Sequence, residues 1–319
     1  MSLDKKFEKL FLNVSNKAAL STFNFIGKKD KKAADKAAVD SMRSELNKIN
    51  MKGKIVIGEG ELDEAPMLYI GEEVGLRNGP ELDIAVDPLE GTNFVANNLP
   101  GAISVICVSE KTNLFGAPET YMNKISANVP NTGIIDLDFS IKKNIDNLAE
   151  FLNKRPENIT ACLLDRPRHR EIIDDLKSLK VKLKLISDGD VSGALLVTDK
   201  KYNVDIFLGI GGGPEGILAA SALDAYNCFF QGKFLFDSDK DKQRAKKMGI
   251  KDFNRKYSLN EIVKGDTIFC ATGITSNELV SGIKIENESF ITETLITHKS
   301  TGLKDRIKIK QKLMQPNNT

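Results

Sequence analysis

Two carboxylates close an apolar segment of this chain, "IAVDPLEGTNF", residues 84–94. Asp87 and Glu90 are three positions apart, and the proline between them restricts the backbone to a turn in which both side chains can converge. Gly91 lets the backbone approach a ligand closely, and the hydroxyl of Thr92 follows at the start of the next segment. A group of oxygen ligands of this kind is typical of sites for magnesium or manganese.

Further acids occupy comparable places in the sequence. Asp35 precedes an apolar stripe in the helix expected over residues 33–49, so its carboxylate falls on the buried face and must be paired, protonated or bound to a cation. Glu59 follows a short apolar strand, and Glu215 follows a glycine run at a helix start. Each acid has a plainer explanation, such as a salt bridge with a nearby lysine, a solvated turn or a favourable helix dipole. Together they predict a ligand site outside the carboxyl ends of the strands of an open α/β sheet.

These residue types suit metal-assisted hydrolysis of a phosphate ester. Clustered carboxylates repel one another unless cations neutralise them, and the backbone carbonyl of Leu89 can supply a further oxygen ligand. A bound divalent ion lowers the pKa of water and stabilises the leaving oxygen, while backbone N–H groups at a helix start hold phosphate oxygens. The hydroxyl of Thr92 can position the water or receive a proton. Because phosphate monoesters hydrolyse extremely slowly without a catalyst, a single general base would not suffice.

Strands and helices alternate along the chain, which predicts a layered α/β architecture. The β-rich runs "KIVIGEGE", "LDIAVDP" and "AISVICVSE" follow the helix at 33–49, and later segments continue the alternation. A turn-rich segment at 128–133 predicts a boundary that divides the chain into residues 1–130 and 131–319, with the final strands free to return to the first part. The acids are expected to meet where these strands end.

Composition limits the classes of partner. The chain is 41% hydrophobic and 28% charged, as in a soluble globular protein, and its net charge of only +2 favours neither nucleic acid nor a membrane surface. The chain has no apolar run approaching the roughly 20 residues that span a bilayer, and its N-terminus lacks the pattern of a secretory signal. The four cysteines stand in apolar surroundings outside any CxxC pair, which indicates core positions in a reducing, cytoplasmic compartment. The two histidines, His169 and His298, are far apart in sequence, which argues against a histidine-rich zinc site.

The hexapeptide "DPLEGT" resembles the Asp-Pro-(Ile/Leu)-(Asp/Glu)-Gly-(Thr/Ser) signature of the lithium-sensitive, metal-dependent sugar and inositol phosphatases. The longer "IVIGEGELDEAPMLYIGEEVG" and "DIAVDPLEGT", followed in order by "RPRH", "SDGDV" and "GIGGGPEG", resemble the class II fructose-1,6-bisphosphatases over nearly the whole chain. The resemblance implies a layered α-β-α-β-α sandwich. It also implies removal of the 1-phosphate of fructose 1,6-bisphosphate in gluconeogenesis, with Mg2+ or Mn2+ as cofactor, by a homodimer or homotetramer.

The resemblance also implies a role for individual residues. The metal ligands would be Asp35, Glu59, Asp87, Glu90 and Glu215. Thr92 would be the catalytic hydroxyl, supported by Lys31 and by the ligands Asp35 and Glu59. The substrate would contact Glu90, Gly91, Thr92, Tyr121, Arg166, Pro167, Arg168, Asp188, Gly189, Asp190 and Gly212. On this basis residues 1–130 would form a metal-binding catalytic lobe and residues 131–319 a sugar-phosphate-binding lobe.

Some of these assignments also follow from the residues alone. Arg166 and Arg168 flank a proline at a strand end and suit a second, non-reacting phosphate, although a basic surface turn has the same pattern. Asp188 and Asp190 end another strand and can accept hydrogen bonds from sugar hydroxyls, although an ordinary Asp-Gly turn also fits. Tyr121, by contrast, reads alone as a half-buried packing residue.

Other activities remain as alternatives. "GGGPEG" between a strand and a helix formally satisfies the G-x-G-x-x-G pattern of a dinucleotide-binding oxidoreductase, but Glu215 would then place an acid where a pyrophosphate binds. A non-catalytic binding protein would have little reason to retain so many converging carboxylates. Within the phosphatases, sedoheptulose-1,7-bisphosphatase and inositol monophosphatase-like activities are the alternatives, and the paired arginines favour a substrate with two phosphates.

Overall fold

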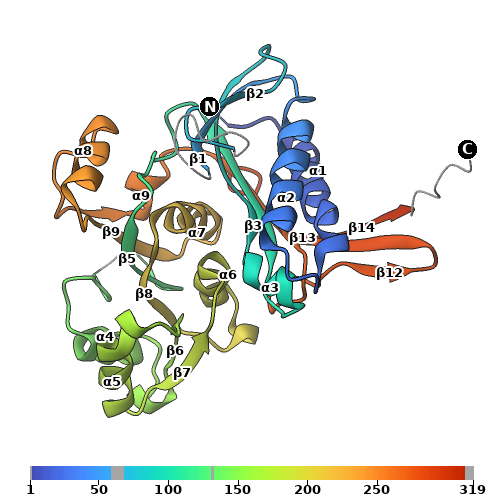
Figure 1. Ribbon diagram of the computed structural model, residues 1–319. Coiled ribbons are helices and arrows are strands. Elements are labelled where there is room, and N and C mark those ends of the chain that lie inside the picture. The colour runs from blue at the N-terminus through green and yellow to red at the C-terminus, as the bar shows by residue number, and fades with distance from the viewer. Residues whose placement is uncertain (1, 59–67, 131–132, 313–319) are drawn as a thin grey trace, which may run out of the picture.

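Two β-sheets organise the fold in the computed structural model, which describes residues 2–58, 68–130 and 133–312 (Figure 1). Among these residues, eight strands form the first sheet in the order β12-β13-β11-β4-β3-β1-β2, with β14 paired to β13. Its strands are β1 (Lys52–Ile57), β2 (Glu73–Val74), β3 (Glu81–Glu90), β4 (Ile103–Glu110), β11 (Thr267–Gly273), β12 (Lys284–Glu286), β13 (Ser289–His298) and β14 (Leu303–Lys312). Most neighbouring strands are antiparallel, but β1 and β3 are parallel.

The second sheet has the strand order β10-β9-β5-β8-β6-β7. Its strands are β5 (Tyr121–Ala127), β6 (Thr160–Leu164), β7 (Lys182–Ile186), β8 (Ile206–Gly212), β9 (Phe229–Leu235) and β10 (Lys256–Ser258). Thus β5 belongs to the second sheet, although it precedes the boundary expected at residue 130, and β11 to β14 lie in the first sheet. The division into two lobes stays a prediction.

Helices form three layers around the two sheets (Figure 1). One apolar cluster joins the first two helices to the first sheet, a second lies between the sheets, and a third joins the second sheet to two further helices. The outer helices are α1 (Lys6–Ser21) and α2 (Lys31–Leu46) on one side, and α4 (Ile141–Phe151) and α5 (Arg170–Ser178) on the other. Between the sheets lie α6 (Asp190–Leu195) and α7 (Gly213–Ala225). This order confirms the expected α-β-α-β-α sandwich.

Helix α7 is central because it is apolar on every side. Nearly all of its residues after the first turn are buried, and it contacts strands of both sheets. A helix without a polar face has no stable place at a surface, so this sequence requires a position between two layers. The remaining α-helices of the described residues are α3 (Thr92–Asn97), α8 (Asp239–Lys247) and α9 (Leu259–Ile262), and five 3-10 helices of three residues each accompany them. No described helix has the length and apolar character needed to cross a bilayer.

Helix α2 follows the predicted apolar stripe but begins and ends slightly earlier than expected. Asp30 caps its start, where the side chain accepts a hydrogen bond from the amide of Ala33 at 3.0 Å. Its buried face carries Ala34, Ala38, Val39, Met42 and Leu46, while Ile49 is buried beyond the helix end.

Strand β3 differs from the sequence prediction at the paired carboxylates. We expected the strand to end at Asp87 in a turn, but β3 continues to Glu90. Its pairing with β4 shifts register between these two residues. Proline cannot donate to a strand ladder, and an irregularity of this kind is where a strand can hold Pro88.

A buried polar cluster fastens the N-terminus to the first sheet. The side chain of His298 is fully buried, with Nδ1 2.6 Å from Glu8 Oε1 and Nε2 3.0 Å from Asp266 Oδ2. Asp266 also accepts hydrogen bonds from the amide of Leu3 at 2.8 Å and from the hydroxyl of Ser300 at 2.6 Å. Burial opposes the charge of Asp266, but the hydrogen bonds from Ser300, Leu3 and His298 outweigh it and lower the pKa of this carboxyl.

Acid should therefore weaken this attachment. The folded pKa of Asp266 lies below the unfolded value of about 3.9, so its stabilising contribution is complete above that pH and is lost as pH falls through the folded pKa. Asp266→Asn should lower the free energy of unfolding at pH 7 by about 1–3 kcal/mol and reduce the further loss below about pH 4. Urea unfolding followed by circular dichroism at several pH values measures both. An unchanged acid dependence in the variant would contradict the role of Asp266.

Candidate active site

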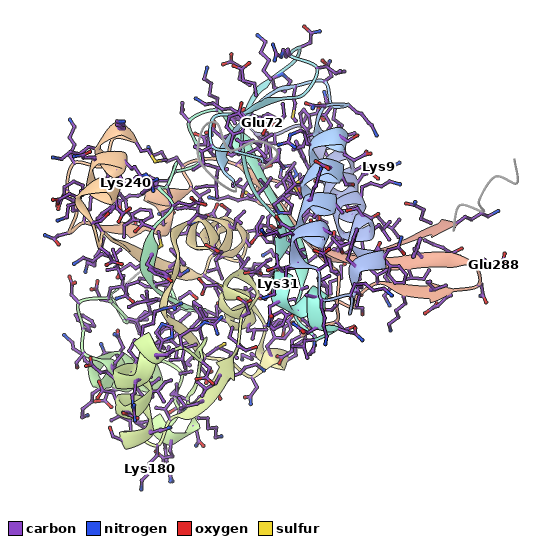
Figure 2. All side chains as sticks on the ribbon, viewed as in Figure 1. Lys9, Lys31, Glu72, Lys180, Lys240 and Glu288 are labelled. Atoms are coloured by element: carbon purple, nitrogen blue, oxygen red, sulfur yellow. The ribbon has the colours of Figure 1, made fainter. Side chains whose placement is uncertain are left out.

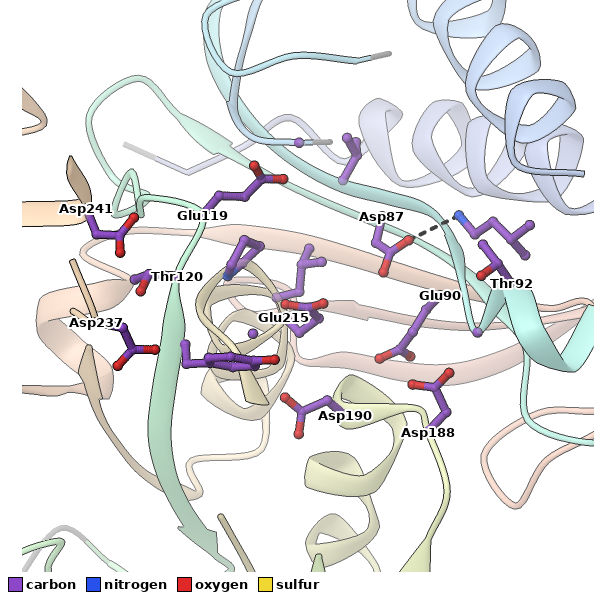
Figure 3. A pocket seen from close by; sticks show the side chains of 18 residues that line it. Asp87, Glu90, Thr92, Glu119, Thr120, Asp188, Asp190, Glu215, Asp237 and Asp241 are labelled. Atoms are coloured by element: carbon purple, nitrogen blue, oxygen red, sulfur yellow. Dashed lines mark hydrogen bonds between the residues drawn. The ribbon is translucent and has the colours of Figure 1, made fainter. Parts of the chain in front are cut away.

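A hollow of about 610 Å3 lies where the acidic segments of the two sheets meet (Figure 3). Its walls come from the end of β3, the start of β5, and the starts of α3, α6 and α7. The predicted site residues that line it are Asp87, Leu89, Glu90, Gly91, Thr92, Tyr121, Asp188, Asp190, Gly212 and Glu215. Segments nearly 130 positions apart in the chain thus contribute to one cavity.

The β3–α3 junction supplies the first acids. Asp87 Oδ1 accepts a hydrogen bond from the amide of Leu89 at 3.1 Å, which folds this carboxylate back over the irregular end of the strand (Figure 3). Glu90 is only 5% exposed. Gly91 has a φ of 86°, in the left-handed region that glycine adopts freely, and it precedes Thr92, the first residue of α3.

Glu90 lies in a strongly negative environment. Its Oε1 accepts a hydrogen bond from the amide of Val191, in the first turn of α6, at 2.8 Å. Burial, partly offset by this hydrogen bond and reinforced by Asp190, Glu215 and Asp188, raises the pKa of Glu90 to about 8. Ionised Glu90 would therefore add negative charge that the groups around it do not neutralise, and a divalent cation can supply that neutralisation.

Glu215 stands in the first turn of α7 and depends on the glycines before it. A Cβ atom on Gly212 would lie 1.8 Å from Glu215 Oε2, so only glycine leaves room for this carboxylate. Burial raises the pKa of Glu215, and the positive charge of Lys124 opposes that rise. The acid at the helix start is thus fitted closely against the backbone of β8.

Lys124 and Asp190 form a buried ion pair beside these acids. The Lys124 ammonium donates to the Asp190 carboxylate and to the carbonyl oxygen of Gly212, the latter at 2.8 Å. Lys124 was not among the predicted site residues. The available signal was a lysine in "YMNKISA" on the same strand face as Met122 and Ser126, since alternate residues share one face.

The predicted arginines lie beside the hollow and contact residues that line it. Arg166 approaches Asp188 with an N–O distance of 3.9 Å. The Arg168 guanidinium lies 4.9 Å from the ring centroid of Tyr121 and donates to the carbonyl of Ile210 at 2.9 Å. Tyr121 is 45% exposed, so it is not the packing residue that the sequence alone suggested. Its ring lines the hollow, and Arg168 contacts that ring from outside.

The turn that carries the arginines is anchored by His169. This side chain is buried, with Nδ1 2.6 Å from the carbonyl of Leu164, and its Nε2 accepts from the amide of Ile210 at 2.7 Å. Burial lowers the pKa of His169, which favours the neutral ring that this pair of hydrogen bonds requires. His169 therefore has a structural role, and Pro167 opens the short helical turn that it closes.

Several predicted residues do not line the hollow. Asp35 is half-buried on α2, and burial raises the pKa of its carboxyl. Lys31 is exposed at the first residue of α2 (Figure 2), while Gly189 directly precedes α6 with a φ of 87°. Glu59 lies outside the described residues, immediately after Gly58, which does line the hollow.

The donor set suits a hard cation. The acids that line the hollow offer carboxylate oxygens, and the described cysteines are buried and free rather than gathered at the site. Within residues 2–58, 68–130 and 133–312, no three histidine, cysteine, aspartate or glutamate side chains are grouped closely enough to hold a metal ion by themselves. The predicted ligand set also includes Glu59, so its completeness stays a prediction.

The structure adds lining residues that the sequence did not single out. Glu119 and Thr120 lead into β5, and Asp237 and Asp241 come from the start of the α8 region on the same side of the hollow, away from Asp87 and Thr92 (Figure 3). The only sequence signal was the charged segment "DSDKDK", which resembles any solvated helix start.

Cation binding should release a proton. Because the pKa of Glu90 is about 8 without a metal, this carboxyl is mostly protonated at pH 7 and must ionise to bind or neutralise a cation. Titration of metal-stripped protein with Mn2+ at pH 7 should release about one proton, and fewer at pH 9 where Glu90 is already charged. Calorimetry in buffers of different ionisation enthalpy measures the number of protons released on Mn2+ binding. The same release from Glu90→Gln would contradict the assignment to Glu90.

Comparison with known proteins places this site in a family. Residues 5–311 match the family described as bacterial fructose-1,6-bisphosphatase, glpX-encoded. The chain is 38% identical to a Synechocystis protein named D-fructose 1,6-bisphosphatase class 2/sedoheptulose 1,7-bisphosphatase, over 89% of this chain and 90% of that protein. A Prochlorococcus marinus protein of the same name is 40% identical, with the same two shares covered.

Among solved structures, an inositol monophosphatase-fructose 1,6 bisphosphatase is 13% identical with a TM-score of 0.36, over 62% of this chain and 73% of that one. The family rests on the sequence matches, which extend over nearly all of the chain and include every segment that lines the hollow. This chain therefore belongs to the bacterial, glpX-encoded fructose-1,6-bisphosphatase family.

Proposed function

We propose that this protein hydrolyses the 1-phosphate of fructose 1,6-bisphosphate with the help of Mg2+ or Mn2+, giving fructose 6-phosphate and inorganic phosphate. The carrying observation is the convergence of Asp87, Glu90, Asp188, Asp190 and Glu215 on one hollow that is bordered by two arginines. Membership of the fructose-bisphosphatase family supports the same conclusion.

The carboxylates and the arginines suggest a division of labour within the site. Asp87, Glu90, Glu215 and the Leu89 carbonyl, with Asp35 and Glu59 as further candidates, would hold the cation. When bound, the cation would supply an acidified water and charge stabilisation at the leaving oxygen. The phosphate that does not react would lie toward Arg166 and Arg168, because guanidinium groups recognise phosphate through paired hydrogen bonds.

The remaining side chains would orient the reactants. The Thr92 hydroxyl, at the first residue of α3, would hold the attacking water or take up its proton, and Gly91 leaves room for the phosphoryl group beside it. Asp188 and Asp190 would accept hydrogen bonds from sugar hydroxyls. Lys31 would add positive charge from the start of α2.

Sedoheptulose 1,7-bisphosphate is the second candidate substrate. The relatives from Synechocystis and Prochlorococcus carry both activities in their names, and both sugars present two phosphates. The dinucleotide-binding alternative is disfavoured because the Glu215 carboxylate fills the space beside Gly212, at the helix start where a pyrophosphate would bind. A cytoplasmic location and a homodimeric or homotetrameric assembly stay predictions from the family resemblance.

Phosphate release by metal-stripped protein tests this function. Fructose 1,6-bisphosphate, sedoheptulose 1,7-bisphosphate and inositol 1-phosphate are compared with and without added Mg2+ or Mn2+. We expect phosphate to be released from fructose 1,6-bisphosphate, and only when the metal is added. Release only from another ester would retain the chemistry and refute the substrate, and absence of release from all three would refute the function.

Thr92→Ala should lower kcat far more than it changes KM. The hydroxyl is proposed to act on the water during the reaction, and groups of this kind contribute about a hundredfold to ten-thousandfold in rate. Thr92→Ser keeps the hydroxyl and is the matched control. Steady-state kinetics with fructose 1,6-bisphosphate measures both constants, and equal activity of the alanine and serine variants would contradict the role.

Arg168→Ala should chiefly raise KM. Loss of a charge-assisted hydrogen bond to the non-reacting phosphate corresponds to about a tenfold to hundredfold rise, with a smaller effect on kcat. Arg155→Ala removes an exposed arginine away from the hollow and should leave both constants unchanged. A fall in kcat without a rise in KM would place Arg168 with the reacting phosphate instead.

A further inference from the structure

The second sheet contains a buried lysine side chain to which the proposed function assigns no role. The side chain of Lys124, on β5, is 1% exposed. Among the described residues, no other lysine or arginine belongs to the buried set. Burial of an ammonium group is costly unless it is paired and hydrogen-bonded, so its environment must compensate for the lost hydration.

The compensating groups come from two other elements. The Lys124 ammonium donates to the Asp190 carboxylate at the start of α6, and to the Gly212 carbonyl at the end of β8 at 2.8 Å. Both Asp190 and Gly212 line the hollow, whereas Lys124 itself does not. The lysine therefore contacts the site from behind and joins three elements that the chain order keeps apart.

The surrounding backbone is shaped for this contact. A Cβ atom on Gly211 would lie 2.0 Å from Asp190 Oδ2, and one on Gly216 would lie 3.0 Å from Lys124 Cδ. A side chain at Gly211 would displace the aspartate, and one at Gly216 would collide with Met122 Sδ at 2.6 Å and press against the lysine stem. The local sequence thus keeps space for one arrangement of the ion pair.

The charge of Lys124 also limits repulsion within the hollow. Asp190 adds to the negative field at Glu90 and Glu215, and Lys124 opposes that field at Glu215. Without the lysine, Asp190 would be a buried carboxylate with no compensating cation, and it would turn toward solvent or another donor. Its proposed contact with a sugar hydroxyl would then be lost.

We propose that Lys124 is a positioning residue on the substrate side of the site: it holds the Asp190 carboxylate in place to receive the sugar of the bound bisphosphate, and the Gly212 carbonyl fixes the ammonium that does so. This inference rests on the proposed function. It assigns Lys124 to the face of the hollow that the second sheet forms. The carboxylates proposed to hold the cation do not depend on Lys124 in this proposal.

The Lys124→Met variant distinguishes positioning from general structural support. Its KM for fructose 1,6-bisphosphate should rise about tenfold to a hundredfold, the usual effect of removing a group that orients a functional side chain. Mn2+ binding to substrate-free protein, measured by calorimetry, should be as tight as in the wild type or tighter, since a positive charge near the carboxylates is gone. A merely structural lysine would instead weaken metal binding along with substrate binding.

Lys256→Met is the matched control. Lys256 lies on β10 of the same sheet and pairs with Asp136 and Asp138, but it does not line the hollow. This variant should lower the melting temperature while leaving KM and Mn2+ affinity unchanged. Unchanged KM in folded Lys124→Met, or Mn2+ binding that weakens in it, would overturn the inference.

A second comparison decides the matter if Lys124→Met does not fold. Lys124→Met/Asp190→Asn removes both buried charges and should match Asp190→Asn alone in kcat/KM, because Lys124 acts through Asp190. A further loss of tenfold or more in the double variant would overturn the inference.

If wild-type protein released no phosphate, the proposed function would fail and this inference with it. Wild-type activity combined with an unaffected Lys124→Met would refute only the inference.

Discussion

Mutual repulsion among carboxylates is the constraint around which this site is built. Burial together with the charges of Asp190, Glu215 and Asp188 raises the pKa of Glu90 to about 8, so the acids cannot all be charged near neutral pH without compensation. The fold supplies part of it through the Val191 amide and the Lys124 ammonium. The remaining negative charge suits a divalent cation, which connects the electrostatics of the fold with the proposed chemistry.

The layered architecture explains how the acids are brought together at all. β3 delivers its carboxylates from the first sheet, while α6 and α7 deliver theirs from the layer between the sheets. Close approach depends on backbone without side chains, since a Cβ atom on Gly211 or Gly212 would collide with Asp190 or Glu215. A glycine run that formally fits a dinucleotide motif thus makes space for carboxylates that a pyrophosphate would avoid.

Sequence reasoning succeeded where chemistry is encoded locally. The segment from Asp87 to Thr92 lines the hollow as one short stretch, and α2 follows its apolar period. It was wrong about the end of β3, because pairing with β4 on the far side of an irregularity outweighs the local turn preference of Pro88. It missed Lys124 because a lysine in a strand usually faces solvent, and only the placement of β5 beside α6 and β8 reveals its partners.

The carboxylates and the arginines lie at different ends of the site, and this separation affects which substrate fits. Its carboxylates gather around Asp87, Glu90 and Glu215, whereas Arg166 and Arg168 lie on the second-sheet side beside Asp188 and Tyr121. A monophosphate would satisfy either the proposed cation or the arginines, and the other group would keep its charge uncompensated by substrate. A bisphosphate would satisfy both ends at once, and its sugar would then lie against Asp188 and Asp190. On this argument the distance between the two phosphates, more than the identity of the sugar ring, sets the preference among substrates.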